Sequence, residues 1–280
     1  MEVARRLGDI ELVSADSMQV YRGMDVGTAK PTAAEQAEVP HHLLDVAEPS
    51  EDFNVARFQA GAAEAIAAIE ARGHRALVVG GTGLYVQAVV DGLSVPGEWP
   101  ELKAELEREP VADLHRRLGE VDPLAASRIE PGNGRRLVRA LEVTLGSGRP
   151  FSSFGPGLGA YPPTTRFRLA GVWLPRPVLA ERIAARYRAQ LENGFLDEVR
   201  RLQAQMSRTA RQALGYRELL AHLVGACTLE EAVAAAVSRT RQFARRQRAW
   251  FRRDPRITWL GARDNPVDLL PALLGDWSLP

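Results

Sequence analysis

The sequence predicts an α/β fold built on a parallel sheet, and three observations lead to this prediction. Residues 10–14 and 76–79 are short apolar runs of the kind that forms buried strands. Polar or Gly-rich turns follow both runs, and an Ala-rich helical pattern, residues 58–71, lies between them. Strands that alternate with helices are typical of parallel sheets, because a crossover helix returns the chain to the same edge.

Spacing and stop signals define the elements of the first third of the chain. The first residues have apolar side chains at helical spacing, and Gly8 follows them as a helix stop. The strand at residues 10–14 leads into a polar loop that contains glycines, residues 19–31. Gly73 ends the Ala-rich helix, and the second strand runs into a Gly turn and a helix that begins near Leu84.

Charged helical patterns fill the middle of the chain. Residues 111–118 and 135–145 are expected to be helices, and a Gly/Pro-rich break covers residues 146–163. Residues 167–174 alternate well enough to form a third strand, and the next helix covers residues 177–190.

The remainder is mostly helical as far as Arg253, and residues 257–260 form a last short strand. We therefore predict an α/β core, residues 1–94 and 165–280, which includes a C-terminal helical part. Residues 95–164 form a helical insertion in this core.

Composition and charge exclude several classes of protein. Hydrophobic residues make up 45% of the 280 residues and charged residues 25%, which is ordinary for a globular domain. The single Cys227 excludes a disulfide framework and a cysteine-based zinc site. No apolar run approaches the roughly 18 residues of a membrane span, and the N-terminus does not resemble a signal peptide. We expect a cytoplasmic monomer without a membrane partner.

The strongest candidate for a reacting group is Asp16, in the segment SADSMQVY. In open parallel sheets ligands bind at the carboxyl ends of the strands, and Asp16 follows directly after a strand. A carboxylate there can act as a general base. An Asp that caps the following turn is the alternative, and the spacing alone favours it.

A second candidate is the Gly-rich turn of residues 80–85, GGTGLY, which joins a strand to a helix. Such turns allow a backbone to approach an anion closely. The turn has no lysine and is not a Walker loop, so tight packing of strand against helix is an equal alternative.

Basic residues cluster in two places. Residues 239–253 contain seven arginines and no acidic residue, and Arg241, Arg245, Arg248 and Arg252 share one helical face. Arginine at this density suits phosphate contacts on an RNA, although a solvated helix face is the alternative. Residues 135–139 form a second basic cluster, and for the pair His41 and His42 we expect a plain turn or packing role.

These segments together carry a resemblance to a known family. The chain contains, in this order, SADSMQVYRGMDVGTAKP, VPHHLLDVAEPSEDFNVARF, GGTGLY, GRRLVRALEV, ALGYRE and SRTRQFARRQRAWFRR. The series closely resembles the bacterial tRNA dimethylallyltransferases, also called tRNA isopentenyltransferases. The resemblance runs from Met1 to about Leu260.

The resemblance implies a P-loop NTPase-like fold of the adenylate-kinase kind, with the helical insertion gripping the tRNA anticodon arm. It implies dimethylallyl diphosphate as the donor, with Mg²⁺ as the cofactor. The acceptor would be the exocyclic amine of the adenosine immediately 3′ of the anticodon, flipped out of its stack to reach the pocket.

The resemblance also assigns roles to residues. Asp16 matches the family's general base, Thr82 the threonine near the reacting adenosine, and Arg217 a residue that helps to hold the diphosphate. No residue is assigned to the metal. The tRNA contacts would be Asp16, Ser17, Met18, Gln19, Lys103, Arg135, Arg136, Leu137, Val138, Arg139, Gln212, Ala213, Leu214, Gly215, Tyr216, Arg217, Arg241 and Arg245.

One part of the family pattern is missing from the sequence. Family members begin with a strand and a loop of the form GPTxxGKS/T, and neither occurs in these 280 residues. That strand would be central, so its loss would leave neighbouring strands with unpaired edges. Two explanations stay open: a start codon placed too late, which a start inside a helix favours, or a true truncation that gives a poorly folded, inactive relative.

Three other functions remain as alternatives. A nucleotide kinase-like P-loop enzyme would not need the arginines of residues 239–253. A tRNA-binding relative without catalysis fits basic segments without a phosphate loop. Prenyl transfer to a free adenine nucleotide would not need the surface of the insertion.

Overall fold

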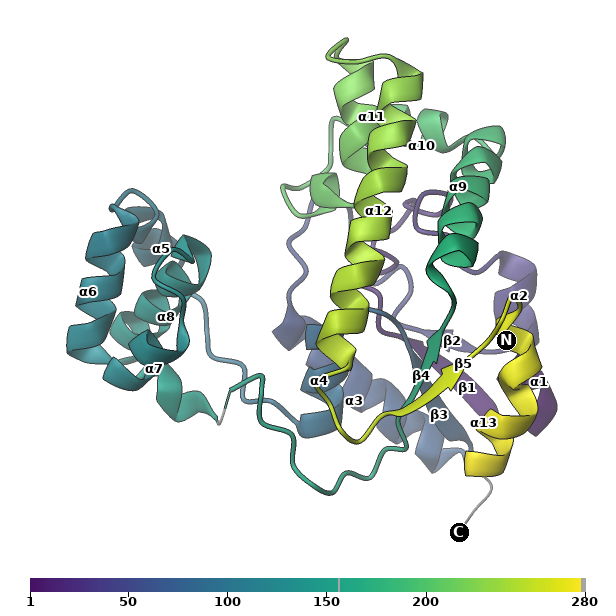
Figure 1. Cartoon of the computed structure of the whole chain (residues 1–280), viewed down its shortest axis with the longest axis horizontal. Coiled ribbons are helices and arrows are strands. Elements are labelled where there is room, and N and C mark those ends of the chain that lie inside the picture. The colour runs from purple at the N-terminus through teal and green to yellow at the C-terminus, as the bar shows by residue number, and fades with distance from the viewer. Residues whose placement is uncertain (156, 278–280) are drawn as a thin grey trace. The chain divides into compact units, whose positions relative to one another are not determined.

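A computed structural model describes residues 1–155 and 157–277 of the chain (Figure 1). The chain forms two compact units. Unit 1 comprises Met1–Asp91 and Pro163–Pro280, and unit 2 comprises Gly92–Pro162. The predicted division was at residues 94/95 and 164/165.

The larger sheet of unit 1 has three parallel strands. They are β1 (Ile10–Ser14), β2 (His41–His42) and β3 (Arg75–Val79), in the order β2-β1-β3. β1 is buried along its whole length and pairs with β3 from Ile10↔Arg75 to Ser14↔Val79. The predicted α/β fold with a parallel sheet is therefore confirmed, and β1 is its central strand.

A second sheet of two strands lies in the same unit. β4 (Ala170–Trp173) pairs in parallel with β5 (Thr258–Gly261), close to the strands predicted at residues 167–174 and 257–260. Within the described residues no strand joins β3 to β4, so each sheet ends in open edges. Val79 and Val172 on these strands are 51% and 48% exposed.

Helices of unit 1 surround the sheets, and their ends carry the expected capping residues. Asn54 and Thr228 cap helices with their side chains, and Gly8 ends the first helix with a left-handed φ of 74°. The helical stretch predicted up to Arg253 is divided into separate helices by short turns. The helices are α1 (Glu2–Leu7), α2 (Ala33–Glu38), α3 (Val55–Ala71), α4 (Gly83–Asp91), α9 (Arg176–Glu192), α10 (Phe195–Leu202), α11 (Tyr216–Leu223), α12 (Leu229–Phe251) and α13 (Leu270–Trp277), with 3₁₀ turns η2 (Ala210–Gln212) and η3 (Pro266–Leu269).

The main core of unit 1 joins the N-terminal segment to the C-terminal helices. Tyr21, Phe58, Phe195 and Tyr216 are all fully buried in one cluster. The rings of Phe195 and Tyr216 meet edge to face, with centroids 4.9 Å apart. This packing fixes the loop after β1 against α10 and α11.

Unit 2 is helical, with a core of its own. It contains α5 (Pro100–Leu106), α6 (Val111–Val121), α7 (Pro123–Arg128), α8 (Gly134–Ser147) and the 3₁₀ turn η1 (Phe151–Phe154). Leucines at helical spacing on α6 and α8 form its centre: Leu114, Leu118, Leu137 and Leu141.

In the part of the chain that the structure describes, no helix combines the length and the apolar character needed to cross a membrane.

Candidate active site

The carboxyl ends of β1 and β3 bring the two strongest candidate segments together. The amide of Ala15 donates to the carbonyl of Val79 over 2.8 Å, so both strands turn away from the sheet at the same level. A Cβ on Gly80 would lie 2.3 Å from the Ala15 carbonyl oxygen. Only glycine therefore allows the GGTG turn to pass this close to the residues that lead into Asp16.

Asp16 caps the turn that follows β1. Its Oδ1 accepts hydrogen bonds from the amides of Met18 and Gln19, over 2.8 and 3.3 Å. Its Oδ2 accepts none from the described residues, and the side chain is half-buried. The turn-capping role is thus present, and it leaves one carboxylate oxygen available for chemistry.

Thr82 contacts the same turn. Its Oγ1 accepts from the amide of Ser17 over 3.3 Å and donates to the Ser17 hydroxyl over 3.4 Å. Thr82 directly precedes α4, whose first amides lack helical partners. A carboxylate, two hydroxyls and a helix start therefore lie side by side at this edge of the sheet.

Gln19 has an internal role that the sequence did not reveal. Its Oε1 accepts from the Ser14 hydroxyl over 2.9 Å. Its Nε2 donates to the carbonyls of Thr28 and Ala29, over 3.2 and 3.3 Å. The side-chain amide thus ties the Asp16 turn to the loop of residues 24–30, and its predicted contact with tRNA stays a prediction.

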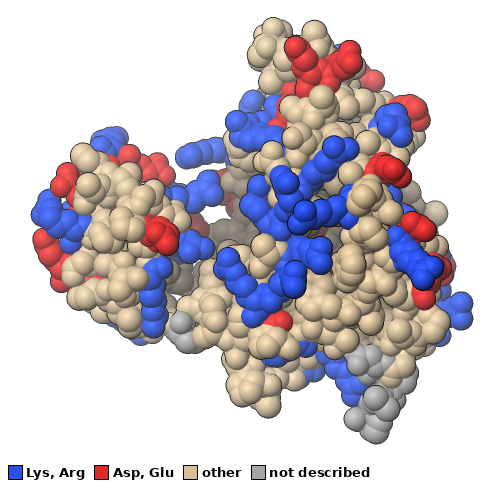
Figure 2. Space-filling model, viewed as in Figure 1, with Lys and Arg blue, Asp and Glu red and all other residues tan. Residues whose placement is uncertain are grey.

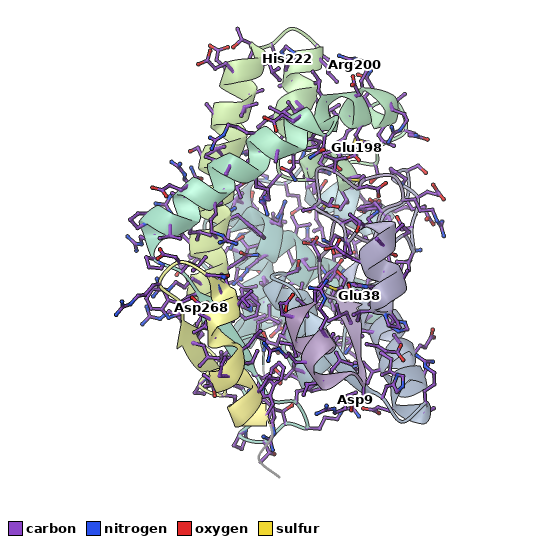
Figure 3. The ribbon with its side chains drawn as sticks, turned by 90° about the vertical axis from the view of Figure 1, so that its right-hand side faces the viewer. Asp9, Glu38, Glu198, Arg200, His222 and Asp268 are labelled. Atoms are coloured by element: carbon purple, nitrogen blue, oxygen red, sulfur yellow. The ribbon has the colours of Figure 1, made fainter. Side chains whose placement is uncertain are left out.

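Glu198, which lies on α10 (Figure 3), also binds that loop, and nothing in the sequence singled it out. The carboxylate accepts from the amides of Asp25, Val26 and Gly27 and from the hydroxyl of Tyr216, over 2.5–3.0 Å. We call this arrangement the Glu198 latch. A Glu in a helix that begins after a Gly carries no local signal for such a contact.

The arginine-rich helix α12 packs on the Gly turn with a face other than its arginine face. Gln247 donates to the Gly81 carbonyl over 3.0 Å, and the Trp250 indole covers Gly83 so closely that a Cβ there would lie 2.4 Å from it. Arg241 and Arg245 are exposed. Lys and Arg side chains gather over the face that α12 crosses (Figure 2).

The segment of residues 212–217 divides into exposed and buried members. Gln212 and Arg217 are exposed, and Arg217 donates to the Gln212 side chain over 3.4 Å. Ala213, Gly215 and Tyr216 are buried, and burial together with the nearby Glu198 carboxylate raises the pKa of the Tyr216 hydroxyl. Side-chain contacts with a ligand can thus come from the exposed members, while the buried ones belong to the core.

The predicted sites of unit 2 divide in the same way. Lys103, Arg135 and Arg136 are exposed. Leu137 and Val138 are buried in the core of unit 2, which is a physical reason against direct RNA contacts by their side chains. Arg139 donates to the carbonyl of Pro96 and pairs with the buried Glu142.

Of the two roles predicted for His41 and His42, a plain turn or a packing role, the plain turn is wrong, because they form β2 and pair with β1. His42 Nε2 lies 2.7 Å from the carboxylate of Glu11, a buried residue of β1. Arg72 and His74 contact the same carboxylate, over 2.7–3.0 Å. Hydrogen bonds from Arg72 above all, and then from the histidines, lower the pKa of Glu11 to about 2.

Comparison with known proteins identifies the family. The model of the IPP transferase family matches residues 19–254. The chain belongs to the IPP transferase family. A tRNA dimethylallyltransferase of Streptomyces coelicolor is 51% identical over 266 residues, which cover 92% of this chain and 84% of the relative. One of Kineococcus radiotolerans is 50% identical over 274 residues, which cover 94% and 85%.

Solved structures of IPP transferases agree with the fold. The full-length tRNA isopentenylpyrophosphate transferase of Bacillus halodurans is similar with a TM-score of 0.69 and 37% identity, over 98% of this chain and 90% of that one. A eukaryotic dimethylallyltransferase acting on tRNA gives a TM-score of 0.77 and 27% identity, over 94% and 70%.

Proposed function

We propose that this IPP transferase moves a dimethylallyl group from dimethylallyl diphosphate to the exocyclic amine of the adenosine 3′ of the tRNA anticodon. Membership of the family supports prenyl transfer to tRNA. The observation that carries the residue assignment is the Oδ2 of Asp16, which accepts no hydrogen bond from the described residues and lies beside the Ser17–Thr82 contact at the carboxyl edge of a parallel sheet.

The reaction needs a base because the lone pair of an adenine amine is delocalised into the ring. As the nitrogen bonds to the prenyl carbon, the carbon–oxygen bond to the diphosphate breaks. Asp16 Oδ2 takes the proton that the amine loses. Thr82 and Ser17 hold the turn in which Asp16 lies, and Thr82 would lie near the adenosine.

The diphosphate leaves with growing negative charge, which Arg217 and the backbone of residues 80–83 would help to stabilise. In the described residues, no three His, Cys, Asp or Glu side chains are grouped to hold a metal. Mg²⁺ does not need such a group, because in proteins it is often held by substrate phosphates and one or two carboxylates. We therefore place Mg²⁺ on the diphosphate of the donor. Bound Mg²⁺ would neutralise the charge that develops on the leaving group.

The tRNA would be held by exposed basic residues of each unit. Arg241 and Arg245 on α12 are exposed, and so are Lys103, Arg135 and Arg136 on unit 2. Such phosphate contacts position an RNA without reading its sequence. The adenosine would leave its stack to reach Asp16.

The decisive experiment compares Asp16→Asn with Asp16→Ala. Each protein receives unmodified tRNA, dimethylallyl diphosphate and Mg²⁺, and digested nucleosides are read by mass. Asn keeps an oxygen that caps the turn but cannot take the proton. If Asp16 is the base, both variants lose on the order of 10²-fold or more in kcat. If it only caps the turn, Asn stays near the unsubstituted activity. Asp9→Asn, an exposed carboxylate paired with Arg75, serves as the control.

Two further arms separate the alternatives. A form extended upstream in the reading frame is compared with residues 1–280 in the same assay. If only the extended form transfers the prenyl group, catalysis needs a phosphate-binding loop encoded upstream. If neither form transfers a prenyl group and tRNA binding still weakens steeply with salt, catalysis is excluded and a tRNA-binding function takes its place. Phosphate transfer from ATP to a nucleoside monophosphate would instead indicate a kinase.

A further inference from the structure

We propose that Glu198 is a positioning residue, which sets the geometry of the Asp16 turn through the loop of residues 24–30 and the side chain of Gln19. The inference rests on the proposed function for the meaning of Asp16. The contacts that carry it are those of the Glu198 latch, of Gln19 and of Asp16 itself.

The Glu198 latch is a complete site for one backbone segment. Glu198 is 3% exposed, and its two carboxylate oxygens receive four hydrogen bonds. From α9, Gln190 Nε2 donates to the carbonyls of Val26 and Gly27, over 2.7 and 3.1 Å. Four successive peptide groups, from residue 24 to residue 28, are therefore held by side chains of α9 and α10, and only their backbone atoms take part in these bonds.

Steric contact makes the latch specific for one loop conformation. A Cβ on Gly27 would lie 2.1 Å from the Phe195 ring and 2.4 Å from the Tyr216 ring. The side chain of Lys30 is buried at the end of the loop, where its ammonium donates to the carbonyl of Tyr21 and the carboxylates of Asp25 and Asp45, over 2.6–2.8 Å. The loop is thus fixed at both ends.

The loop passes this geometry to the Asp16 turn through the side chain of Gln19. The two carbonyls that receive the Gln19 amide, those of Thr28 and Ala29, come directly after the latched peptides. Ala29 has a φ of 50°, a left-handed conformation that is unusual for Ala and needs support from its surroundings. Gln19 also donates its backbone amide to Asp16 Oδ1. Movement of the loop would therefore release one of the two bonds that orient the carboxylate.

A purely structural role for Glu198 makes a different prediction. In that case its loss would loosen the loop and the core while the amides of Met18 and Gln19 kept their protection. Hydrogen–deuterium exchange measures both regions in one experiment and does not require turnover.

The experiment compares Glu198→Gln, Tyr216→Phe and Glu11→Gln with the unsubstituted chain. Gln keeps the volume of Glu but replaces one acceptor oxygen by a donor, and Phe removes only the phenol bond. Glu11 is a buried carboxylate in the same unit that does not touch the loop, so its variant is the control for general destabilisation.

We expect Glu198→Gln to speed exchange of the amides of residues 25–27 by about tenfold or more, and of Met18 and Gln19 by roughly threefold or more. Tyr216→Phe should speed exchange of the same amides, but by smaller factors. In prenyl transfer, Glu198→Gln should lower kcat by about tenfold and leave the KM for tRNA within about twofold, because positioning of the reacting group and not tRNA binding is affected.

Two results would overturn the inference. In one, residues 25–27 exchange faster while Met18 and Gln19 do not. In the other, Glu11→Gln speeds exchange at Met18 and Gln19 as much as Glu198→Gln does. If neither the unsubstituted chain nor the form extended upstream transfers a prenyl group, the proposed function fails by that assay alone, and the exchange data still decide whether Glu198 positions the turn.

Discussion

Two buried carboxylates of unit 1, Glu11 and Glu198, are stabilised in opposite ways. Glu11 is surrounded by side chains that carry or can carry positive charge: Arg72, His42 and His74. Glu198 has no cationic partner among the described residues, and backbone amides and a phenol bind it instead. Asp9, two residues before Glu11 in the chain, and Glu38 are well separated from Glu198 (Figure 3).

The difference shows what each carboxylate can control. Charged partners attract from several directions and tolerate small shifts, so Glu11 ties strands and helices together without specifying a fine geometry. Amide donors must point at the oxygens, so Glu198 specifies the path of a backbone. A site that orients a reacting group gains more from the second kind of contact.

The largest expected effect comes from removing the Glu198 carboxylate. Glu198→Ala leaves three amides and the Tyr216 hydroxyl without partners in a buried place, so we expect the free energy of unfolding to fall by about 4 kcal/mol. Urea denaturation measures it. Glu192→Ala, on the exposed end of α9, should change stability by less than about 0.5 kcal/mol. A loss below about 1 kcal/mol for Glu198→Ala would contradict the importance of the latch.

A steric change should break the same latch from the side of the loop. In Gly27→Ala the new methyl group meets the Phe195 and Tyr216 rings, and we expect a loss of about 2 kcal/mol. The control is Gly119→Ala in α6, where the added methyl group has nothing within 4 Å. There helix propensity predicts a gain of up to about 1 kcal/mol. Equal effects at the two positions would show that crowding at Gly27 is relieved freely.

Loss of the charge at Glu11 should cost less than loss of the latch. Glu11→Gln keeps the shape and removes the attraction to Arg72, whose side chain is 48% exposed and therefore partly screened. We expect a decrease of about 1–2 kcal/mol in unfolding free energy. A decrease larger than that of Glu198→Ala would reverse the proposed contrast.

The smallest effect is a difference in acid sensitivity. The pKa of Glu11 is lowered from 4.5 to about 2 in the folded protein, so the unfolded chain binds the proton more readily between these values. Stability from Glu11 is thus present above pH 4.5 and is lost as pH falls towards 2. Between pH 5 and 3 the unsubstituted chain should lose about 1 kcal/mol more than Glu11→Gln does. If the unfolding free energies of the unsubstituted chain and of Glu11→Gln fall in parallel as the pH is lowered, this assignment is excluded.

The sequence predicted the elements whose signals are local. The buried strand at residues 10–14, the helix ended by Gly73 and the Gly turn after β3 all follow from apolar runs and stop residues, and the structure places them there. The shortest strand, β2, was missed because two residues, His41 and His42, carry no periodicity.

The site was predictable only as far as its residues lie close in sequence or match a family motif. The proximity of Asp16 and Thr82 follows from two parallel strands that end at the same edge. The contact of Glu198 with residues 25–27 spans more than 170 positions, and no pattern in either segment indicates the other. The shared face of Arg241, Arg245, Arg248 and Arg252 follows from helical spacing, but the bond of Gln247 to Gly81 depends on how α12 crosses the turn.

The way the chain leaves unit 1 at Asp91 and returns at residue 163 has a consequence for engineering. The Thr165 hydroxyl donates to the Val90 carbonyl over 3.5 Å, so the two crossing points are neighbours within unit 1. Arg256 also fastens Asp91 to the chain just before β5, over 2.7 Å. Residues 92–162 can therefore be exchanged as a unit. A short Gly/Ser linker, or the corresponding segment of another relative, can join Asp91 to residue 163 without distorting unit 1.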